Sequence, residues 1–264
     1  MSGFKEKPDR SPKVLADVAP ESLLLLGAGS AILLQLANPA VGYGVARHSN
    51  FAADPLKRLH GTLSYIYALS NGTPAQRKHV QQQVQRAHLP VKSAAGAGNP
   101  AYNSADPALQ LWVAATLYKS AAQTYDSIFP ALDARDGESV YLSYSVLGTA
   151  LGMPAQLWPG STADFAEYWA QQLGQLSVDE TVREVARELL AAKHAPLWIK
   201  VIMPVARFLT IGFLPPAVRQ MYGFNWSPRK DKYLRLSLRA AALLARITPR
   251  WIRHSPMRYY LKRI

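Results

Sequence analysis

Apolar residues recur along most of the chain at the three-to-four-residue spacing of an amphipathic α-helix, whereas the alternation typical of a β-strand is scarce. Several segments begin with an expected N-cap, which is Asp54, Thr73 or Asp106 followed by proline, or Ser177 in a capping box with Glu180. Others end at proline or glycine, as helices commonly do. The pattern predicts helices over residues 21–37, 55–69, 74–88, 107–125, 137–151, 162–173, 177–192, 198–213 and 230–247. The sequence therefore predicts an all-α protein with one multi-helix domain.

The expected organisation is a polar N-terminal arm over residues 1–19, a helical domain over 20–255 and a basic tail over 256–264. No linker rich in glycine, serine or proline divides the chain, and residues 92–100 are expected to form a small, glycine-rich loop. A single hydrophobic core is therefore favoured over two.

Composition narrows the function classes that this chain of 264 residues could serve. Cysteine is absent, which excludes disulfides, thiolate metal sites, iron–sulfur clusters and cysteine nucleophiles. The segment Gly27-Ala28-Gly29-Ser30 lacks the third glycine and the preceding strand of a dinucleotide-binding motif. The apolar run over residues 23–36 is shorter than the ~20 residues of a membrane span and is typical of a buried core helix. We therefore expect a cytoplasmic protein.

Positive charge is concentrated near the C-terminus. The formal net charge is +13, and residues 229–264 contain eleven Lys and Arg residues against a single acid, Asp231. Such a segment could be drawn to an anionic membrane surface, or it could simply be a solvated basic face whose arginines partly meet carboxylates elsewhere. The solvated face is favoured, peripheral contact with anionic lipid stays open, and nucleic acid is not an expected partner.

His88 is a candidate for chemistry because of its place on a helix. Val80, Val84 and His88 recur every four residues, with Ala87 beside them, and this stripe is predicted to face the core. His79 lies off the stripe and should be solvated. A core histidine usually makes an ordinary hydrogen bond, but a single neutral imidazole on a core face is also what an axial haem ligand requires. Both readings stay open at this point.

The preceding helix has a polar row next to its core stripe. Arg58, Thr62 and Tyr65 line up at successive turns beside the predicted core stripe, which consists of Leu56, Leu59, Leu63 and Ile66. An arginine and two hydroxyl groups suit the polar edge of a buried ligand, and the arginine could pair with a haem carboxylate. The alternative is a surface row in which Thr62 bonds its own backbone.

Eight short segments stand in a fixed order along roughly residues 20–255: 33–39 (LLQLANP), 45–51 (VARHSNF), 54–62 (DPLKRLHGT), 84–88 (VQRAH), 102–107 (YNSADP), 111–113 (LWV), 150–154 (ALGMP) and 214–223 (LPPAVRQMYG). In this order they resemble DUF2236, the family that includes the latex-clearing rubber oxygenases and the fungal MpaB oxygenase. The ordered set is more specific than any single segment.

The resemblance implies a globin-like helical core that binds haem b through one histidine, and His88 matches that histidine. The family's arginine and threonine, four residues apart on a preceding helix, match Arg58 and Thr62. The predicted site therefore has His88 as the metal ligand and Arg58 and Thr62 as the catalytic residues. Arg58, Thr62 and Tyr65 join His88 as cofactor contacts.

The resemblance also implies the reaction class. The rubber oxygenases use O2 to split an isoprenoid double bond, and MpaB is linked to cleavage of a terpenoid side chain. The expected partners are thus O2 and a small apolar, isoprenoid-like or lipid-like substrate. Two positions depart from the family: Gly61 replaces the lysine of the rubber oxygenases that can occupy the distal iron site, and Ala114 replaces a histidine common after the Trp-Val pair.

Three functions from different classes are consistent with the sequence. The first is a haem b-dependent oxygenase, and the second is a haem-binding or lipid-binding protein without turnover. The third is a basic helical module that binds a membrane surface or nucleic acid through residues 229–263.

Overall fold

The computed structural model describes residues 11–48, 55–96, 100–193 and 195–264, and for residues 55–58 it describes the backbone only. Helices make up nearly all of the regular structure in this part of the chain, which confirms the predicted all-α class. The elements are α1 (Leu15–Val18), the 3-10 helix η1 (Ser22–Gly27), α2 (Ala28–Ala37), α3 (Pro39–His48), α4 (Pro55–Asn71), α5 (Pro74–His88), β1 (Lys92–Ser93), β2 (Tyr102–Asn103), α6 (Pro107–Ile128), α7 (Ala134–Ser143), α8 (Val146–Thr149), the 3-10 helix η2 (Ala155–Leu157), α9 (Thr162–Gln175), α10 (Glu180–Ala191), α11 (Leu197–Phe213), α12 (Pro216–Met221), α13 (Pro228–Ile247), α14 (Arg250–Arg253) and α15 (Ser255–Leu261).

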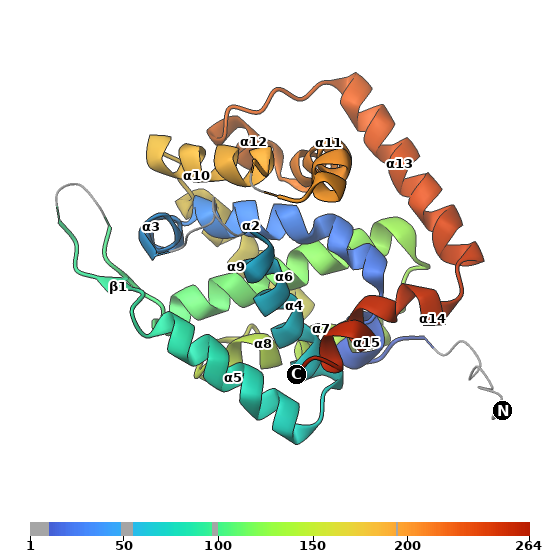
Figure 1. Ribbon diagram of the computed structural model, residues 1–264, viewed down its shortest axis with the longest axis horizontal. Helices are drawn as coiled ribbons and strands as arrows, with labels where there is room; N and C mark the ends of the chain where they lie inside the picture. Colours follow the sequence, from blue (N-terminus) through green and yellow to red (C-terminus); the bar gives the residue numbers. More distant parts are fainter. Residues whose placement is uncertain (1–10, 49–54, 97–99, 194) are drawn as a thin grey trace.

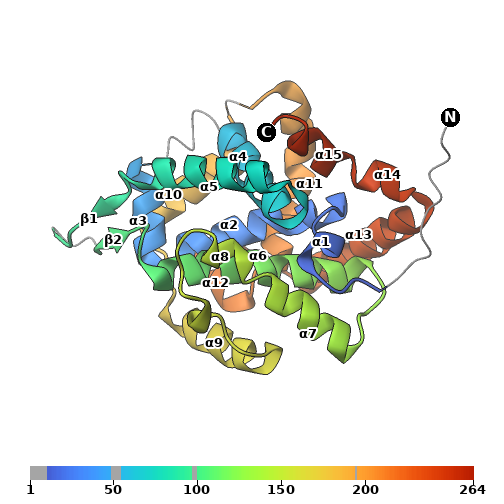
Figure 2. The same cartoon turned by 90° about the horizontal axis from the view of Figure 1, so that it is seen from below.

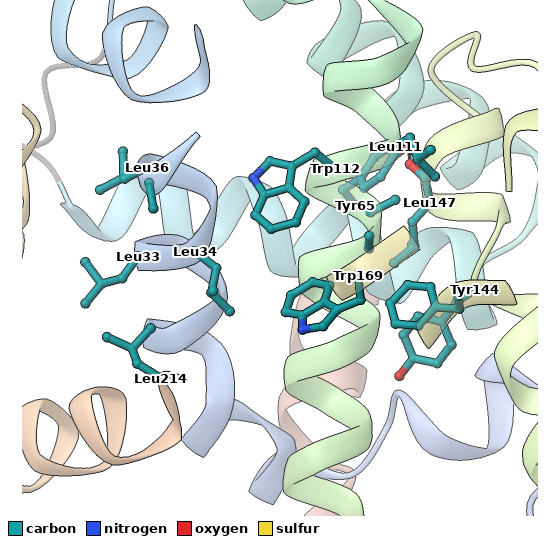
Figure 3. Close-up of a cluster of buried hydrophobic side chains, with 14 of the residues drawn as sticks. Leu33, Leu34, Leu36, Tyr65, Leu111, Trp112, Tyr144, Leu147, Trp169 and Leu214 are labelled. Atoms are coloured by element: carbon teal, nitrogen blue, oxygen red, sulfur yellow. Dashed lines mark hydrogen bonds between the residues drawn. The ribbon is translucent and has the colours of Figure 1, made fainter. Parts of the chain in front are cut away.

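Helix α6 lies at the centre of the molecule and is the element around which the others pack. Helices α2 and α13 and the 3-10 helix η1 pack directly against it, and the two views show α7 and α9 on the side away from α4 and α5 (Figures 1 and 2). Trp112 of α6 has no solvent-exposed surface and stacks on Trp169 of α9, with ring centroids 5.3 Å apart. Figure 3 shows this pair between the leucines of α2 and the side chains of Tyr144 and Leu147.

Small residues allow α2 to approach its neighbours closely. Ser30 donates a hydrogen bond to the carbonyl oxygen of Gly27 at 2.7 Å, and its hydroxyl lies 3.3 Å from that of Ser120 on α6. On another face of α2, a Cβ atom added to Gly29 would collide with the side chain of Thr210 on α11. These contacts explain why small residues interrupt the leucine-rich run over residues 23–36.

We therefore expect Gly29→Ala to lower the free energy of unfolding by about 1–3 kcal/mol, since the added methyl group overpacks the contact with α11. Gly137→Ala is the matched control: its added Cβ meets nothing closer than the Cβ of Leu132 at 3.9 Å. This second change should raise the free energy of unfolding by about 0.5–1 kcal/mol, because alanine is the better helix former. Urea unfolding followed by circular dichroism measures both, and changes of the same sign would contradict the packing described.

The N-terminal half of the chain differs from the predicted elements in two places. The helix expected over residues 21–37 is a 3-10 segment followed by α2, and α3 begins directly afterwards at Pro39. The expected loop over residues 92–100 contains β1, which pairs with β2 in an antiparallel two-stranded ladder. Proline thus ends one helix and also serves as the first residue of the next, where its missing N–H costs nothing.

Two later predictions also need correction. The segment expected as one helix over residues 137–151 forms α7 and α8, separated by a turn. Helix α10 begins two residues later than expected, because Asp179 rather than Ser177 is its N-cap. The Asp179 side chain accepts a hydrogen bond from the backbone N–H of Val182 at 2.9 Å.

Among the described helices, none is long and apolar enough by itself to cross a membrane. Residues 22–37 together with Pro39–His48 meet the criteria of length and composition as a pair, but they are bent by 102°. Within the pair, Leu33, Leu34 and Leu36 are buried in the core shown in Figure 3.

The C-terminal helices are fastened to the N-terminal part of the chain. Arg253 pairs with Glu21 at 2.8 Å, and His254 Nε2 lies 3.0 Å from the other oxygen of the same carboxylate. Helix α15 packs against α4, and the carbonyl oxygen of Leu261 accepts a hydrogen bond from Gln76 of α5 at 2.6 Å. Part of the basic segment therefore stabilises the fold. The sequence analysis allowed for this, because it expected some arginines to pair with carboxylates elsewhere in the chain. The boundaries at residues 19 and 255 stay a prediction.

Candidate functional site

Helices α4 and α5 pack against each other and carry every residue of the predicted site. A short turn joins them, and Thr73 caps α5 in a reciprocal capping box with Gln76. The core stripe predicted for α4 is confirmed at Leu63, which is buried, and at Ile66, which packs on the core. Figures 1 and 2 show both helices on the side of the molecule where α15 and the C-terminus lie.

Thr62 lies on α4 and is partly buried, so its hydroxyl group is at the boundary between core and solvent. Arg58 lies one helical turn earlier on the same helix, but its side chain is outside the described part of the chain, as is Asp54, the expected N-cap. Gly61 is exposed, and a Cβ atom added there would meet nothing within 4 Å. No side chain therefore occupies the position of the family's lysine. Arg58 and Thr62 lie on the same face of α4 because they are four residues apart on one helix.

Tyr65 belongs to the core instead of the solvated edge of the helix. Only 6% of its surface is exposed, and its hydroxyl group donates a hydrogen bond to the carbonyl oxygen of Leu147 at 2.9 Å. Burial raises the pKa of the Tyr65 phenol above its usual value, so the group stays neutral. Its interaction with the α8 backbone positions α4, and the ring lies close to Leu147 in Figure 3.

His88 is the last residue of α5 and is partly buried. The stripe on which it was placed is confirmed at Val80, which is 1% exposed, and at Val84, which packs against the core. His79 is exposed as expected, whereas Ala87 is exposed and does not face the core. The stripe thus turns outward near the end of α5, which places His88 at the edge of the core and not within it.

Two polar residues that the sequence reasoning did not single out fix the backbone at His88. Its carbonyl oxygen accepts hydrogen bonds from the Ser104 hydroxyl and from the backbone N–H of Val91, both at 2.8 Å. Gln110 at the start of α6 donates to the carbonyl oxygen of Ser104 at 3.1 Å, and its own side-chain oxygen is buried without a partner among the described residues. Ser104 belongs to segment 102–107, one of the eight that resemble the family, so the sequence could have indicated that it has a role.

Among the described residues, no group of three or more His, Cys, Asp or Glu could hold a metal ion. A single imidazole at a partly exposed helix end, with a threonine on the neighbouring helix, is a donor set that fits iron held in a porphyrin, because the macrocycle supplies the other ligands. Two other histidines have hydrogen-bond partners of their own: a ring nitrogen of His48 bonds to the Tyr102 hydroxyl group, and one of His60 bonds to that of Tyr260. Thr62 and His88 on neighbouring helices are therefore a donor set compatible with haem.

Two cavities lie elsewhere, where α6 faces α7 and α9. Their volumes are about 480 and 500 Å³. Both are lined by Tyr118, Ala122, Asp126 and Thr162, and neither is lined by Thr62, Tyr65 or His88. Burial raises the pKa of Tyr118 to about 12, so this phenol is neutral at physiological pH. These cavities are separate from the α4–α5 pair.

Comparison with known proteins gives one family and two relatives. A family model described as "ER-bound oxygenase mpaB/B'/Rubber oxygenase, catalytic domain" matches residues 16–247. Two proteins described as uncharacterized, one from Mycobacterium tuberculosis and one from Mycobacterium bovis, are each 34% identical to the chain over 236 residues. Each alignment covers 87% of this chain and 92% of the relative. No solved structure matches the chain.

Proposed function

Because the chain belongs to the family of mpaB and rubber oxygenase catalytic domains, we propose that it is a haem b-dependent oxygenase acting on a small apolar substrate. The family assigns an oxygenase domain, and with it a substrate and O2 as the reactants. The observation that carries the finer proposal is the placement of His88 at the partly exposed end of α5, on a helix packed against the one that carries Thr62.

In this proposal His88 would hold the iron through one ring nitrogen, and haem, when bound, would supply the metal that activates O2. Ser104 and Val91 act on the His88 backbone, so they hold the end of α5 in place and limit the positions that the imidazole can adopt. Since Tyr65 is committed to the Leu147 carbonyl, it serves as a positioning residue of α4.

Thr62 supplies the hydroxyl group that orients O2, and Arg58 pairs with a haem carboxylate or helps to position O2. Arginine suits the first role because its planar guanidinium group matches a carboxylate with two parallel hydrogen bonds. Gly61 leaves the position of the rubber oxygenases' lysine without a side chain, so this residue could not supply a nitrogen ligand to haem. An isoprenoid-like or lipid-like alkene is the substrate class that we propose.

Oxygen uptake tests turnover. The full chain, reconstituted with haemin and given a panel of small isoprenoid alkenes, is expected to consume O2 and to yield carbonyl cleavage products detectable by mass spectrometry. Thr62→Val should lower the rate by about tenfold or more while the haem content is kept, and Thr62→Ser should recover much of it. Haem binding without O2 consumption for any alkene would support the non-catalytic haem-binding reading instead.

A further inference from the structure

Helix α13 has three distinct faces, and one of them is apolar but exposed. At 3.6 residues per turn, Leu234, Leu238, Ala241 and Ala245 fall on one face and pack toward α6 and α11. A second face carries large apolar side chains that are 47–68% exposed, which we call the apolar stripe: Tyr233, Leu236, Leu243, Leu244 and Ile247. Exposure of this size in a continuous helical row is unusual for a surface that meets only water.

The third face of α13 is positively charged and adjoins the apolar stripe. Its members, which we call the basic stripe, are all exposed: Lys232, Arg235, Arg239 and Arg246. None of them forms an ion pair with another described residue. The only acid on the helix, Asp231, accepts a hydrogen bond from Trp226 at 2.6 Å and lies near the N-terminal end.

The exposed apolar row continues into α14, where Trp251 and Ile252 are 64% and 42% exposed. The ion pair between Arg253 and Glu21 fixes α14 to the start of η1, so these side chains are held on the outside of the molecule. Figure 1 shows α13 along the outer edge of the molecule, with α14 following it. Tryptophan at the end of such a row is typical of a membrane interface.

We propose that α13 and the start of α14 form an interfacial helix that docks the protein on the surface of an anionic lipid bilayer. The apolar stripe would enter the boundary between headgroups and acyl chains, while the basic stripe beside it would contact anionic headgroups. The positive charge of the basic stripe, which has no ion-pair partner among the described residues, is the reason for proposing an anionic partner. This inference does not rest on the proposed function, since it holds whether or not the protein binds haem.

Two other partners fit the surface less well. Nucleic acid would use the basic stripe, but phosphate contacts by Lys and Arg leave no role for five large apolar side chains. A second copy of the chain would bury the apolar stripe, but it would also bring two basic stripes close together, and like charges at an interface are unfavourable.

A second exposed apolar row, on α11, provides an internal comparison. Leu197, Trp198, Val201, Ile202 and Val205 are 51–78% exposed. Only Lys200 and Arg207 are basic on this helix, and Arg207 donates a hydrogen bond to the carbonyl oxygen of Leu190 at 2.8 Å. The α11 row therefore lacks the charge that would attract anionic lipid, although it is as apolar as the α13 stripe.

The absence of cysteine allows one probe to be placed at a time. We would introduce Leu244→Cys on α13 or Val201→Cys on α11 into the full chain and label each with a polarity-sensitive fluorophore. The vesicles would be phosphatidylcholine alone or phosphatidylcholine with about one third phosphatidylserine, which provides a negative surface potential. We expect a blue shift and a gain in fluorescence at position 244 with the anionic vesicles only, and no change at position 201.

Two triple variants separate the apolar and charge contributions in vesicle sedimentation. Replacing Leu236, Leu243 and Ile247 by Ser, or Arg235, Arg239 and Arg246 by Gln, should each weaken binding to anionic vesicles by about tenfold or more. The matched control removes the same number of charges from exposed positions outside α13, with Lys78, Arg135 and Lys193 changed to Gln. It should change binding by less than about twofold.

Any one of four results would overturn the proposal. These are equal binding to neutral and anionic vesicles, a fluorescence change at position 201 and not at 244, an equal loss of binding in the charge control, and a concentration-dependent fluorescence gain at 244 without vesicles. The last result would assign the stripe to a second copy of the chain. Circular dichroism of each variant verifies the fold, and the single-cysteine proteins keep the test decisive if a triple variant unfolds.

Discussion

Replacing His88 by alanine is expected to abolish haem b binding or to shift the haem spectrum, with a loss of most of the haem content. In the proposed site this imidazole would be the iron ligand that the protein supplies, so its removal would leave the metal without a bond from the chain. Haem content and the absorption spectrum of the purified variant measure the effect. A haem content and spectrum equal to those of the wild type would show that the ligand assignment is wrong.

His79→Ala is the matched control for this experiment. His79 lies on the same helix as His88, but it is exposed and off the stripe formed by Val80 and Val84. Its loss should leave both haem content and the spectrum unchanged. Comparing the two variants separates a ligand effect from a general effect of removing an imidazole from α5.

Replacing Glu21 by glutamine is expected to lower the free energy of unfolding by about 3–5 kcal/mol, because it breaks a buried ion pair and leaves the Arg253 charge without its partner. The side chains of Glu21 and Arg253 are 7% and 14% exposed. The Arg253 guanidinium group also lies 5.5 Å from the Phe129 ring, so it is surrounded by protein on several sides. Denaturant unfolding of the full chain measures the change.

Two comparisons test that prediction. Glu180→Gln removes a carboxylate that pairs with Arg183 and Arg187 on the surface of α10, and the melting temperature should stay unchanged because exposed pairs contribute little. The double change Glu21→Gln with Arg253→Met should cost less than Glu21→Gln alone, since no unpaired charge stays buried. Equal losses of stability on replacing Glu21 and Glu180 would show that the ion pair between Glu21 and Arg253 does not stabilise the protein.

The helical class and many of the helix ends could be predicted because their signals are local. Thr73 and Asp106 cap α5 and α6 as expected, with proline at the first helical position of each. The family was likewise within reach of the sequence, since eight short segments in a fixed order indicated the match that the family model confirms over residues 16–247.

The parts that could not be predicted depend on packing between distant segments. The helix α3 after Pro39 has a weak apolar pattern, and its glycines contact neighbouring elements: a Cβ atom at Gly42 would collide with the side chain of Val182 and with the carbonyl oxygen of Leu36. The split between η1 and α2 follows the close approach of Gly27 to Ser120 and Thr124 of α6, which periodicity along one segment does not reveal.

The candidate site was predicted in part. Thr62 and His88 lie on adjacent packed helices, as expected. Tyr65 is instead a core residue, because its hydroxyl group donates a hydrogen bond to the carbonyl oxygen of Leu147, 82 residues away in the sequence. Ala87 was misplaced because the stripe of Val80 and Val84 turns away from the core at the end of α5. Ser104, just after β2, bonds to the end of α5, and Gln110 of α6 bonds to Ser104, so their role requires the tertiary fold.

The absorption spectrum and haem content of the freshly purified full chain, measured before and after titration with haemin, test whether the protein binds haem. We expect a Soret band and about one haem b per chain, since one imidazole would hold the iron. A colourless protein that takes up no haemin at stoichiometric concentration, although its circular dichroism shows it folded, would contradict the proposed haem-dependent oxygenase.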